Sequence, residues 1–226
     1  MFEPRYSPRL PDRARPVCII GAGSIVRDAH LPAYALAGFP VHAITNRCRE
    51  QAEDLAAKFG IPHVAADLDE LMATAPEGAV FDLTLPANLF AGVLRRLPEG
   101  SPVLIQKPMG ETMDEAREIL EVCRERRLVA AINFQLRFAP FVMAAKDLID
   151  RGVIGELRDM EIRVTVETPW DHFPFLRSVK RLEILYHSVH HIDCIRHFLG
   201  DPRGIHAKTL THPELAMPSS RSAIIL

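Results

Sequence analysis

The chain is poor in features that mark several large classes of protein. Its four cysteines, Cys18, Cys48, Cys123 and Cys194, lie far apart, and no CxxC pair exists. This spacing argues against a thiolate metal site or a disulfide framework, and it suits a reducing cytosol. No stretch approaches the roughly 18 apolar residues that a transmembrane helix requires. The sequence therefore predicts a cytoplasmic protein without a membrane-spanning helix.

An excess of charge of either sign is also absent. Lys and Arg total 27, and Asp and Glu total 29, which gives a formal net charge of −2. Proteins that bind nucleic acids or anionic membranes typically carry a basic excess, so neither partner is expected. Hydrophobic residues make up 48% and charged residues 25% of the chain, as in an ordinary globular protein.

The two ends of the chain differ from the rest. Residues 1–16 hold four Pro and four Arg but no apolar run of the kind found in signal peptides. We expect this segment to be a flexible leader. At the other end the chain stops inside an apolar, strand-like run from Ala223 to Leu226. A natural domain rarely ends in this way, so we expect the sequence to be a fragment.

From Val17 to about Asn133, short apolar runs alternate with amphipathic segments. Such alternation predicts an α/β domain with a parallel sheet covered by helices on both faces. Pro32 should distort or interrupt the first helix, and Asp67 should lie near the cap of the third. The expected strands are 17–20, 41–45, 79–85, 103–105 and 128–132, and the expected helices are 24–37, 49–59, 67–74, 89–97 and 111–126.

The pattern changes after Asn133, which predicts a second, mixed α+β domain over 134–226. Helices are expected at 138–151 and at 181–199, the latter ended by Gly200. Strands are expected at 157–167, where apolar and polar residues alternate, and at 205–211 and 222–226.

The turn after the first strand carries Gly21-Ala22-Gly23. Glycine at such a turn allows close approach of a pyrophosphate, and the helix that follows offers free N–H groups from Ser24 and Ile25. The third glycine of the usual dinucleotide fingerprint is replaced by Val26. Any tight strand-to-helix turn can carry two glycines, but this placement favours dinucleotide binding.

The end of the second strand should meet the adenosine ribose of such a cofactor. An acidic residue there binds the 2′-hydroxyl of NAD, whereas an arginine accommodates the 2′-phosphate of NADP. The chain has Thr45-Asn46-Arg47 and no carboxylate. Arg47 therefore favours NADP over NAD, and the alternative is a solvated arginine at the start of a helix.

Two further segments carry residues suited to chemistry. Gln106-Lys107-Pro108 follows the strand at 103–105, where Pro108 restricts the backbone and helps aim the Lys107 ammonium. The segment 183–193 carries polar residues three or four positions apart, which places them on one face of a helix. They are Glu183, His187 or Tyr186, His190 and Asp193. A histidine there suits acid–base chemistry near neutral pH.

The alternatives for these histidines are structural. His187 and His191 are spaced for a metal, but no third ligand is evident, so no metal is expected. A histidine can also be the partner of a buried group, and His197 can simply favour the helix dipole.

Five stretches together resemble the Gfo/Idh/MocA oxidoreductases, the glucose–fructose oxidoreductase, inositol dehydrogenase and rhizopine-catabolism group, and occur in that family's order. They are GAGSIVRDAHLPAY from Gly21, QKPMG from Gln106, INFQLRFAP from Ile132, VIGELRDMEIRV from Val153 and SVHHIDCIRHFLG from Ser188. The resemblance implies a Rossmann domain over 17–133 and an α+β domain with a mostly antiparallel sheet, truncated here, over 134–226. It also implies a homo-oligomer formed through that sheet.

The resemblance further implies an NAD(P)-dependent dehydrogenase or reductase acting on a sugar, polyol or related hydroxy or keto compound. The family's lysine corresponds to Lys107 and its acid–base histidine to His190. Two positions depart from the family: its glutamate is Gln106 here, and its helix aspartate is Tyr186, which can relay a proton but is no carboxylate at neutral pH. These departures keep two alternatives open, a non-catalytic dinucleotide-binding regulator and a relative that uses NAD transiently for glycosidic cleavage.

The remaining site residues are expected around these groups. On the cofactor side we expect Leu85, Pro86, Asn88, Gln106 and Pro108 to join the turn residues and Asn46. On the substrate side we expect Asn133, Arg137, Trp170 and His187. Arg137 has a structural ion pair as its alternative, and Trp170 a packed surface loop.

Overall fold

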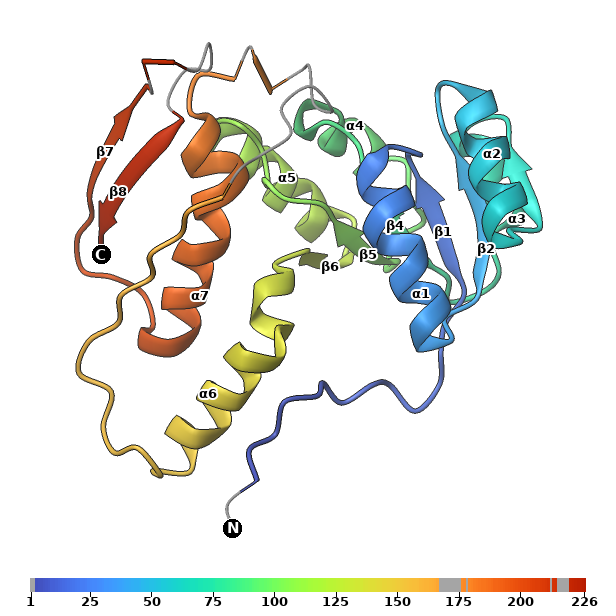
Figure 1. Cartoon of the computed structure of the whole chain (residues 1–226). Helices are drawn as coiled ribbons and strands as arrows, with labels where there is room; N and C mark the ends of the chain where they lie inside the picture. The colour runs from blue at the N-terminus through green and yellow to red at the C-terminus, as the bar shows by residue number, and fades with distance from the viewer. Residues whose placement is uncertain (1–2, 167–175, 178, 212, 215–219) are drawn as a thin grey trace. The chain divides into compact units, whose positions relative to one another are not determined.

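The computed structural model describes residues 3–166, 176–177, 179–211, 213–214 and 220–226. The chain divides into two compact units. The first, Pro11–Asn133, is called the sheet unit here, and the second, Met1–Leu10 with Phe134–Leu226, is called the helical unit. Figure 1 labels the elements of both.

A six-stranded parallel sheet forms the centre of the sheet unit. The strands lie in the order β3-β2-β1-β4-β5-β6, so the order of the chain reverses between β1 and β4. Such a switch point is where open α/β sheets bind ligands. The strands are β1 (Val17–Ile20), β2 (Val41–Thr45), β3 (His63–Ala65), β4 (Val80–Leu83), β5 (Pro102–Ile105) and β6 (Val129–Ile132).

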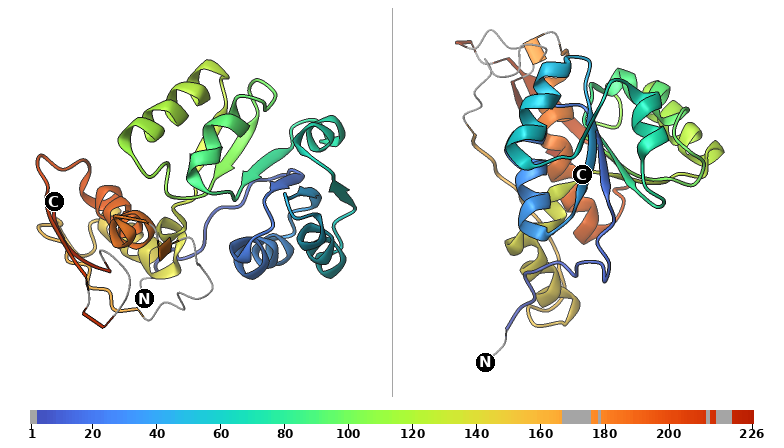
Figure 2. Two further views of the ribbon diagram at one scale, coloured as in Figure 1. Left: turned by 90° about the horizontal axis from the view of Figure 1, so that it is seen from above. Right: turned by 90° about the vertical axis from the view of Figure 1, so that its right-hand side faces the viewer.

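Helices cover both faces of this sheet, as the sequence predicts. Alternate residues of β1 point to opposite faces, Ile19 into a core with Leu31 and Leu55, and Ile20 into a core with Leu94 and Ile119. Figure 2 shows the corresponding helices on the two sides of the sheet. They are α1 (Leu31–Ala37) and α2 (Arg49–Phe59) on one face, and α3 (Leu68–Thr74), α4 (Phe90–Leu94) and α5 (Met113–Glu125) on the other.

Residues with side chains suited to helix capping lie at the N-terminal ends of α3 and α5. The Asp67 carboxylate accepts a hydrogen bond from the backbone N–H of Glu70, which confirms the cap expected for α3. The Thr112 hydroxyl caps α5 in the same way. The strand β3 is absent from the sequence prediction because its three residues give no periodic pattern.

The described residues of the helical unit form two short turns, two helices and a two-stranded sheet. They are η3 (Gln135–Phe138), α6 (Pro140–Asp150), η6 (Ile184–Ser188), α7 (Val189–Leu199), β7 (His206–Leu210) and β8 (Arg221–Ile225), with β7 and β8 paired antiparallel. Leu176, Val179 and Leu182 form its one described buried apolar cluster.

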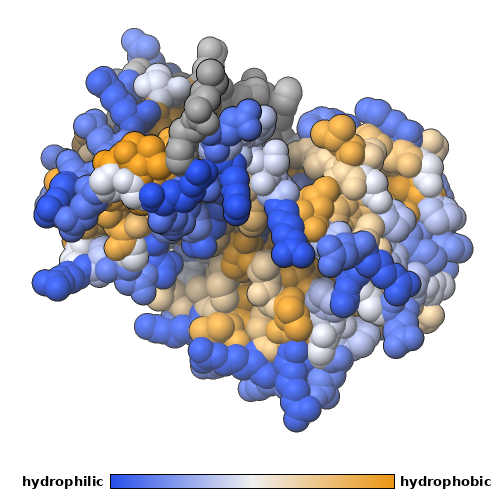
Figure 3. All heavy atoms as spheres, turned by 90° about the horizontal axis from the view of Figure 1, so that it is seen from below, coloured by the Kyte–Doolittle hydropathy of each residue, from blue (hydrophilic) through white to orange (hydrophobic). Residues whose placement is uncertain are grey.

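Large apolar side chains of this unit stay exposed, including Phe138 and Phe141. Apolar patches reach the surface of the molecule on the face drawn in Figure 3. Among the described residues, no helix is long and apolar enough to cross a membrane.

The strand expected at 157–167 is wrong over its described part. Residues 157–166 form no strand, although their apolar and polar residues alternate. Val164 and Val166 are more than half exposed. A strand exists only by pairing with a neighbour, and in the described part of the chain β7 pairs with β8 alone. Alternation without a partner strand leaves the segment irregular.

Candidate cofactor and catalytic site

The turn that follows β1 is built around Gly21. Its backbone has a φ of +114°, and a Cβ atom there would lie 2.6 Å from Thr84 Oγ1 and 2.7 Å from the Thr84 carbonyl oxygen. Only glycine fits such a close approach between the ends of β1 and β4. Gly23 differs, because a Cβ there would meet nothing within 4 Å. Gly21 is therefore required by the fold, and the open side of Gly23 leaves space for a ligand.

The helix after this turn begins with a π-helical segment. The backbone N–H of Leu31 donates to the carbonyl of Val26, five residues earlier, which defines the wide turn η1 (Val26–His30). Pro32 has no N–H to continue a regular α-helical ladder, which confirms the interruption expected there. The wide turn ends at His30, whose ring is buried.

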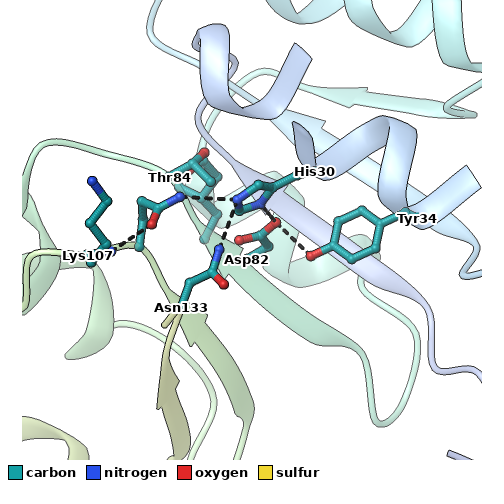
Figure 4. A network of polar contacts seen from close by, with 8 residues as sticks. His30, Tyr34, Asp82, Thr84, Lys107 and Asn133 are labelled. Atoms are coloured by element: carbon teal, nitrogen blue, oxygen red, sulfur yellow. Dashed lines mark hydrogen bonds and ion pairs between the residues drawn. The ribbon is translucent and has the colours of Figure 1, made fainter. Parts of the chain in front are cut away.

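His30 is the centre of a polar network in the sheet unit, shown in Figure 4. Its Nδ1 lies 2.7 Å from Asp82 Oδ2, and the Tyr34 hydroxyl donates to the same oxygen over 2.8 Å. Its Nε2 lies 3.2 Å from both Gln106 Nε2 and Asn133 Nδ2. These residues come from η1, α1, β4 and the ends of β5 and β6, so the network crosses the sheet unit.

Lys107 adjoins this network through its backbone. Its N–H donates to Gln106 Oε1 over 2.8 Å, and the backbone N–H of Gln106 donates to the Leu83 carbonyl of β4. The Lys107–Pro108 peptide bond is cis. Burial lowers the pKa of the Lys107 ammonium to about 8. A lysine with that pKa is still mostly a cation at neutral pH and exchanges its proton readily.

The other residues expected on the cofactor side also lie in the sheet unit. Asn46 and Arg47 follow β2, where the Asn46 amide donates to the Cys48 carbonyl and to Gln51 Oε1, and Arg47 is exposed. Leu85, Pro86 and Asn88 follow β4, with Leu85 half-buried and the other two exposed. Turn, ribose-side and strand-end residues thus all belong to loops at the carboxyl ends of β1, β2, β4 and β5.

The helical unit holds the histidines expected at 183–193. A second wide turn, η6, is closed by the backbone N–H of Val189 donating to the Ile184 carbonyl. Within it the Glu183 carboxylate accepts from the Ser188 hydroxyl over 2.8 Å and lies 2.8 Å from His187 Nδ1. Tyr186 packs against the Leu182 cluster. The histidine expected as acid–base, His190, meets Phe134 edge to face at 6.1 Å between ring centroids.

Two residues of the face predicted from helical spacing have described carboxylate contacts. Glu183 pairs with His187, and Asp193 pairs with Arg137 of η3. The guanidinium of Arg137 donates to both oxygens of the buried Asp193 over 2.6 Å. This ion pair is the structural alternative considered for Arg137. Burial lowers the pKa of His191, against the opposing influence of Glu183.

Two further points concern Trp170 and the question of a metal site. Trp170 lies outside the described residues. In the part of the chain that the structure describes, no group of three or more His, Cys, Asp or Glu side chains could hold a metal ion.

Sequence reasoning missed His30, Tyr34, Asp82 and Thr84. One signal for them was present, because Asp82 stands between Phe81 and Leu83 in an otherwise apolar strand. A carboxylate buried in a central strand needs hydrogen-bonding partners. The pattern does not reveal which residues supply them, since His30 and Asp82 are 52 positions apart.

A sequence model of the Gfo/Idh/MocA family, described as an oxidoreductase family with an NAD-binding Rossmann fold, matches residues 15–134. The chain is 31% identical over 156 residues to the dTDP-3,4-didehydro-2,6-dideoxy-alpha-D-glucose 3-reductase of Streptomyces violaceoruber. The aligned region covers 68% of this chain and 45% of that protein. It is 28% identical over 190 residues to the 1,5-anhydro-D-fructose reductase of Ensifer adhaerens, covering 81% of this chain and 56% of that one.

A similar fold occurs in a solved oxidoreductase from Agrobacterium radiobacter in complex with NAD+, L-tartaric acid and magnesium. The TM-score is 0.77 at 19% identity, with 94% of this chain and 62% of that chain covered. The chain spans about half the length of the curated relatives it matches.

Proposed function

The chain belongs to the Gfo/Idh/MocA oxidoreductase family, and from that premise we propose that its protein is an NAD(P)-dependent dehydrogenase or reductase for a sugar-like hydroxyl or ketone. The observation that carries the proposal is Lys107. It is a partly buried cation at the end of β5, held by Gln106 in the same unit as the glycine turn. The reductases of Streptomyces violaceoruber and Ensifer adhaerens, both named for sugar substrates, support the substrate class.

The cofactor side of the site fits a dinucleotide. The open side of Gly23 and the first N–H groups of the helix from Ser24 and Ile25 suit a pyrophosphate. Leu85, Pro86, Asn88, Gln106 and Pro108 would lie along the nicotinamide. When bound, the nicotinamide supplies the acceptor or donor of a hydride.

The side chains of this protein would handle the oxygen and its proton. The Lys107 ammonium holds the reacting oxygen and stabilises negative charge as it develops there. His190 accepts the hydroxyl proton at a ring nitrogen, with Tyr186 as orienter or relay. The substrate would be contacted by Asn133, His187 and Trp170. Arg137 would join them where its ion pair with Asp193 permits.

Arg47 supports a preference for NADP. It is exposed beside Asn46 at the end of β2, where this chain has no carboxylate to bind a ribose 2′-hydroxyl. Titration of the full-length protein with NADPH and NADH, followed by nicotinamide fluorescence, tests this. Tighter binding of NADPH that is lost in Arg47→Asp is expected. Equal affinities in the wild type would overturn the preference, and binding of neither would overturn the cofactor assignment.

We also propose that the protein works in the cytoplasm as a homo-oligomer formed through the C-terminal sheet. Its four cysteines are all free thiols, as a reducing compartment favours. Analytical ultracentrifugation of the full-length protein gives the oligomeric state, and a monomer at micromolar concentration would contradict this assembly.

Lys107→Met tests the catalytic proposal directly. We expect turnover to fall by about a hundredfold or more while NADPH still binds, because the positive charge on the reacting oxygen is lost. Lys58→Met, at an exposed position of α2, is the matched control and should keep its activity. Unchanged turnover in Lys107→Met would remove Lys107 from the mechanism.

A further inference from the structure

The contacts of His30 show which of its ring nitrogens carries a proton. The argument begins at Gln106, whose side-chain orientation is fixed by a backbone group. The Lys107 N–H donates to one end of the Gln106 amide over 2.8 Å, so that end is the oxygen. The other end is therefore the NH2 group, and it lies 3.2 Å from His30 Nε2.

His30 Nε2 must consequently be an acceptor. An NH2 group only donates, so a proton on Nε2 would place two donors against each other. The amide nitrogen of Asn133 lies at the same distance from Nε2 and agrees with this direction. With Nε2 unprotonated, the ring carries its proton on Nδ1 and donates it to Asp82 Oδ2 over 2.7 Å.

The carboxylate side of the network is consistent with this assignment. Asp82 is fully buried and accepts from both His30 and the Tyr34 hydroxyl. Burial, the charge of Asp82 and the hydrogen bond to it raise the pKa of Tyr34 far above its ordinary value, so the hydroxyl keeps its proton. Every described contact therefore points one way, from the amides through a neutral imidazole to one carboxylate.

We propose that Gln106 is a positioning residue that holds the Lys107 backbone against a neutral, Nδ1-protonated His30. One side-chain amide performs both tasks, since its oxygen accepts from Lys107 and its nitrogen donates to His30. His30 in turn ends the wide turn η1, which follows the glycine turn. The position of Lys107 is thereby tied to the segment that would hold the cofactor.

The proposal makes a specific statement about glutamate at position 106. A carboxylate has no N–H, so it could accept from Lys107 but could not donate to His30 Nε2. It would instead require a second proton on the ring, which would then lie between Asp82 and the new carboxylate. Gln106→Glu should thus favour a proton on each ring nitrogen of His30. The role in turnover rests on the proposed function, whereas the protonation state does not.

Long-range proton–nitrogen NMR of the full-length protein labelled with 15N-histidine measures which ring nitrogens carry a proton. The signals of His30 are assigned by comparison with His30→Gln. The wild type should show a protonated Nδ1 and an unprotonated Nε2. Gln106→Glu should show two protonated nitrogens, and Gln135→Glu, an exposed control in η3, should match the wild type. A proton on Nε2 in the wild type, or an unchanged ring in Gln106→Glu, would overturn the assignment.

Gln106→Met tests the positioning role, because it keeps the length of the side chain and removes both hydrogen bonds. We expect kcat to fall about tenfold to a hundredfold, as misplacement of a catalytic group does, and KM to change by a smaller factor than kcat. An unchanged kcat would overturn the positioning role. If the wild type turns over no sugar-like substrate, the proposed function fails, while the NMR result still decides the state of His30.

Discussion

Among the described residues, two π-helical turns each bring a histidine against a carboxylate, and the two differ in how they do so. In the sheet unit, η1 ends at His30, and its partner Asp82 comes from β4, 52 positions away. In the helical unit, η6 carries His187, and its partner Glu183 stands four residues earlier on the same helix. His30 and Asp82 are 7% and 0% exposed, whereas His187 and Glu183 are 27% and 18% exposed.

The difference shows how the same pair of groups can be structural in one place and adaptable in another. At η1 the pair joins two elements and is almost sealed from water, so water cannot replace either group if one is removed. At η6 the pair joins neighbouring positions of one helix, and water reaches both groups. Solvent can replace a lost partner there at small cost. A histidine in the second setting remains available for chemistry.

Truncation of each carboxylate in turn should give the largest difference in stability between the two pairs. Asp82→Ala leaves the His30 and Tyr34 donors buried without an acceptor, and we expect it to lower the free energy of unfolding by about 3 kcal/mol. Glu183→Ala should cost less than about 1 kcal/mol. Urea denaturation followed by circular dichroism measures both. Equal losses would show that burial does not distinguish the two pairs.

The ion pair between Arg137 and Asp193 lies between these extremes. Asp193 is buried but the Arg137 side chain is 38% exposed, and the pair joins η3 to α7. We expect Asp193→Ala to destabilise the protein by about 2 kcal/mol, less than a sealed pair because water rehydrates the guanidinium. Asp150→Ala, which removes the exposed partner of Lys146, is the control and should change little. A loss as small as that of the control would place Arg137 among the adaptable groups.

Burial in the sheet unit should also make Lys107 a cost to stability. Its pKa is about 8 in the folded protein and about 10.4 in an unfolded chain. Between these pH values the unfolded chain binds more protons, so wild-type stability rises with pH there. Lys107→Met should therefore be more stable than the wild type at pH 7, by about 1 kcal/mol, and lose this advantage above about pH 10.

Denaturation midpoints at pH 7 and pH 10 provide the test, with Lys58→Met as the control for removal of one positive charge. A Lys107→Met variant that is less stable than the wild type at pH 7 would mean that the ammonium stabilises the fold. The sealed environment would then favour the cation rather than disfavour it.

The same contrast between distant and local contacts explains how far the sequence predicts the structure. Apolar runs such as Val17–Ile20 and caps such as Asp67 and Gly200 depend on neighbouring residues, and each is found where the pattern predicts it. The Glu183–His187 pair also follows from helical spacing. The His30–Asp82 pair does not, because strand order and a wide turn decide it.

The wrong strand and the unpredicted ion-pair partner have the same cause. Residues 157–166 carry the alternation of a strand, but a strand requires a partner that their own sequence does not specify. The ion pair expected as an alternative for Arg137 does form, but its partner Asp193 lies 56 positions away and could not be named from the sequence. Patterns along the chain thus predict elements and local pairs, and fail where a contact joins separate elements.

Pro32→Ala is expected to have the smallest effect and asks what holds η1 wide. No proline follows η6 within four residues, so a wide turn does not require one. If the His30–Asp82 pair holds η1, the turn persists in Pro32→Ala, and the unfolding free energy changes by less than about 0.5 kcal/mol, because a regained N–H offsets the lost rigidity of proline. Hydrogen exchange of the Leu31 amide reports the turn, since this amide donates to Val26. Loss of protection in Pro32→Ala would show that the proline, and not the buried pair, shapes the turn that positions His30.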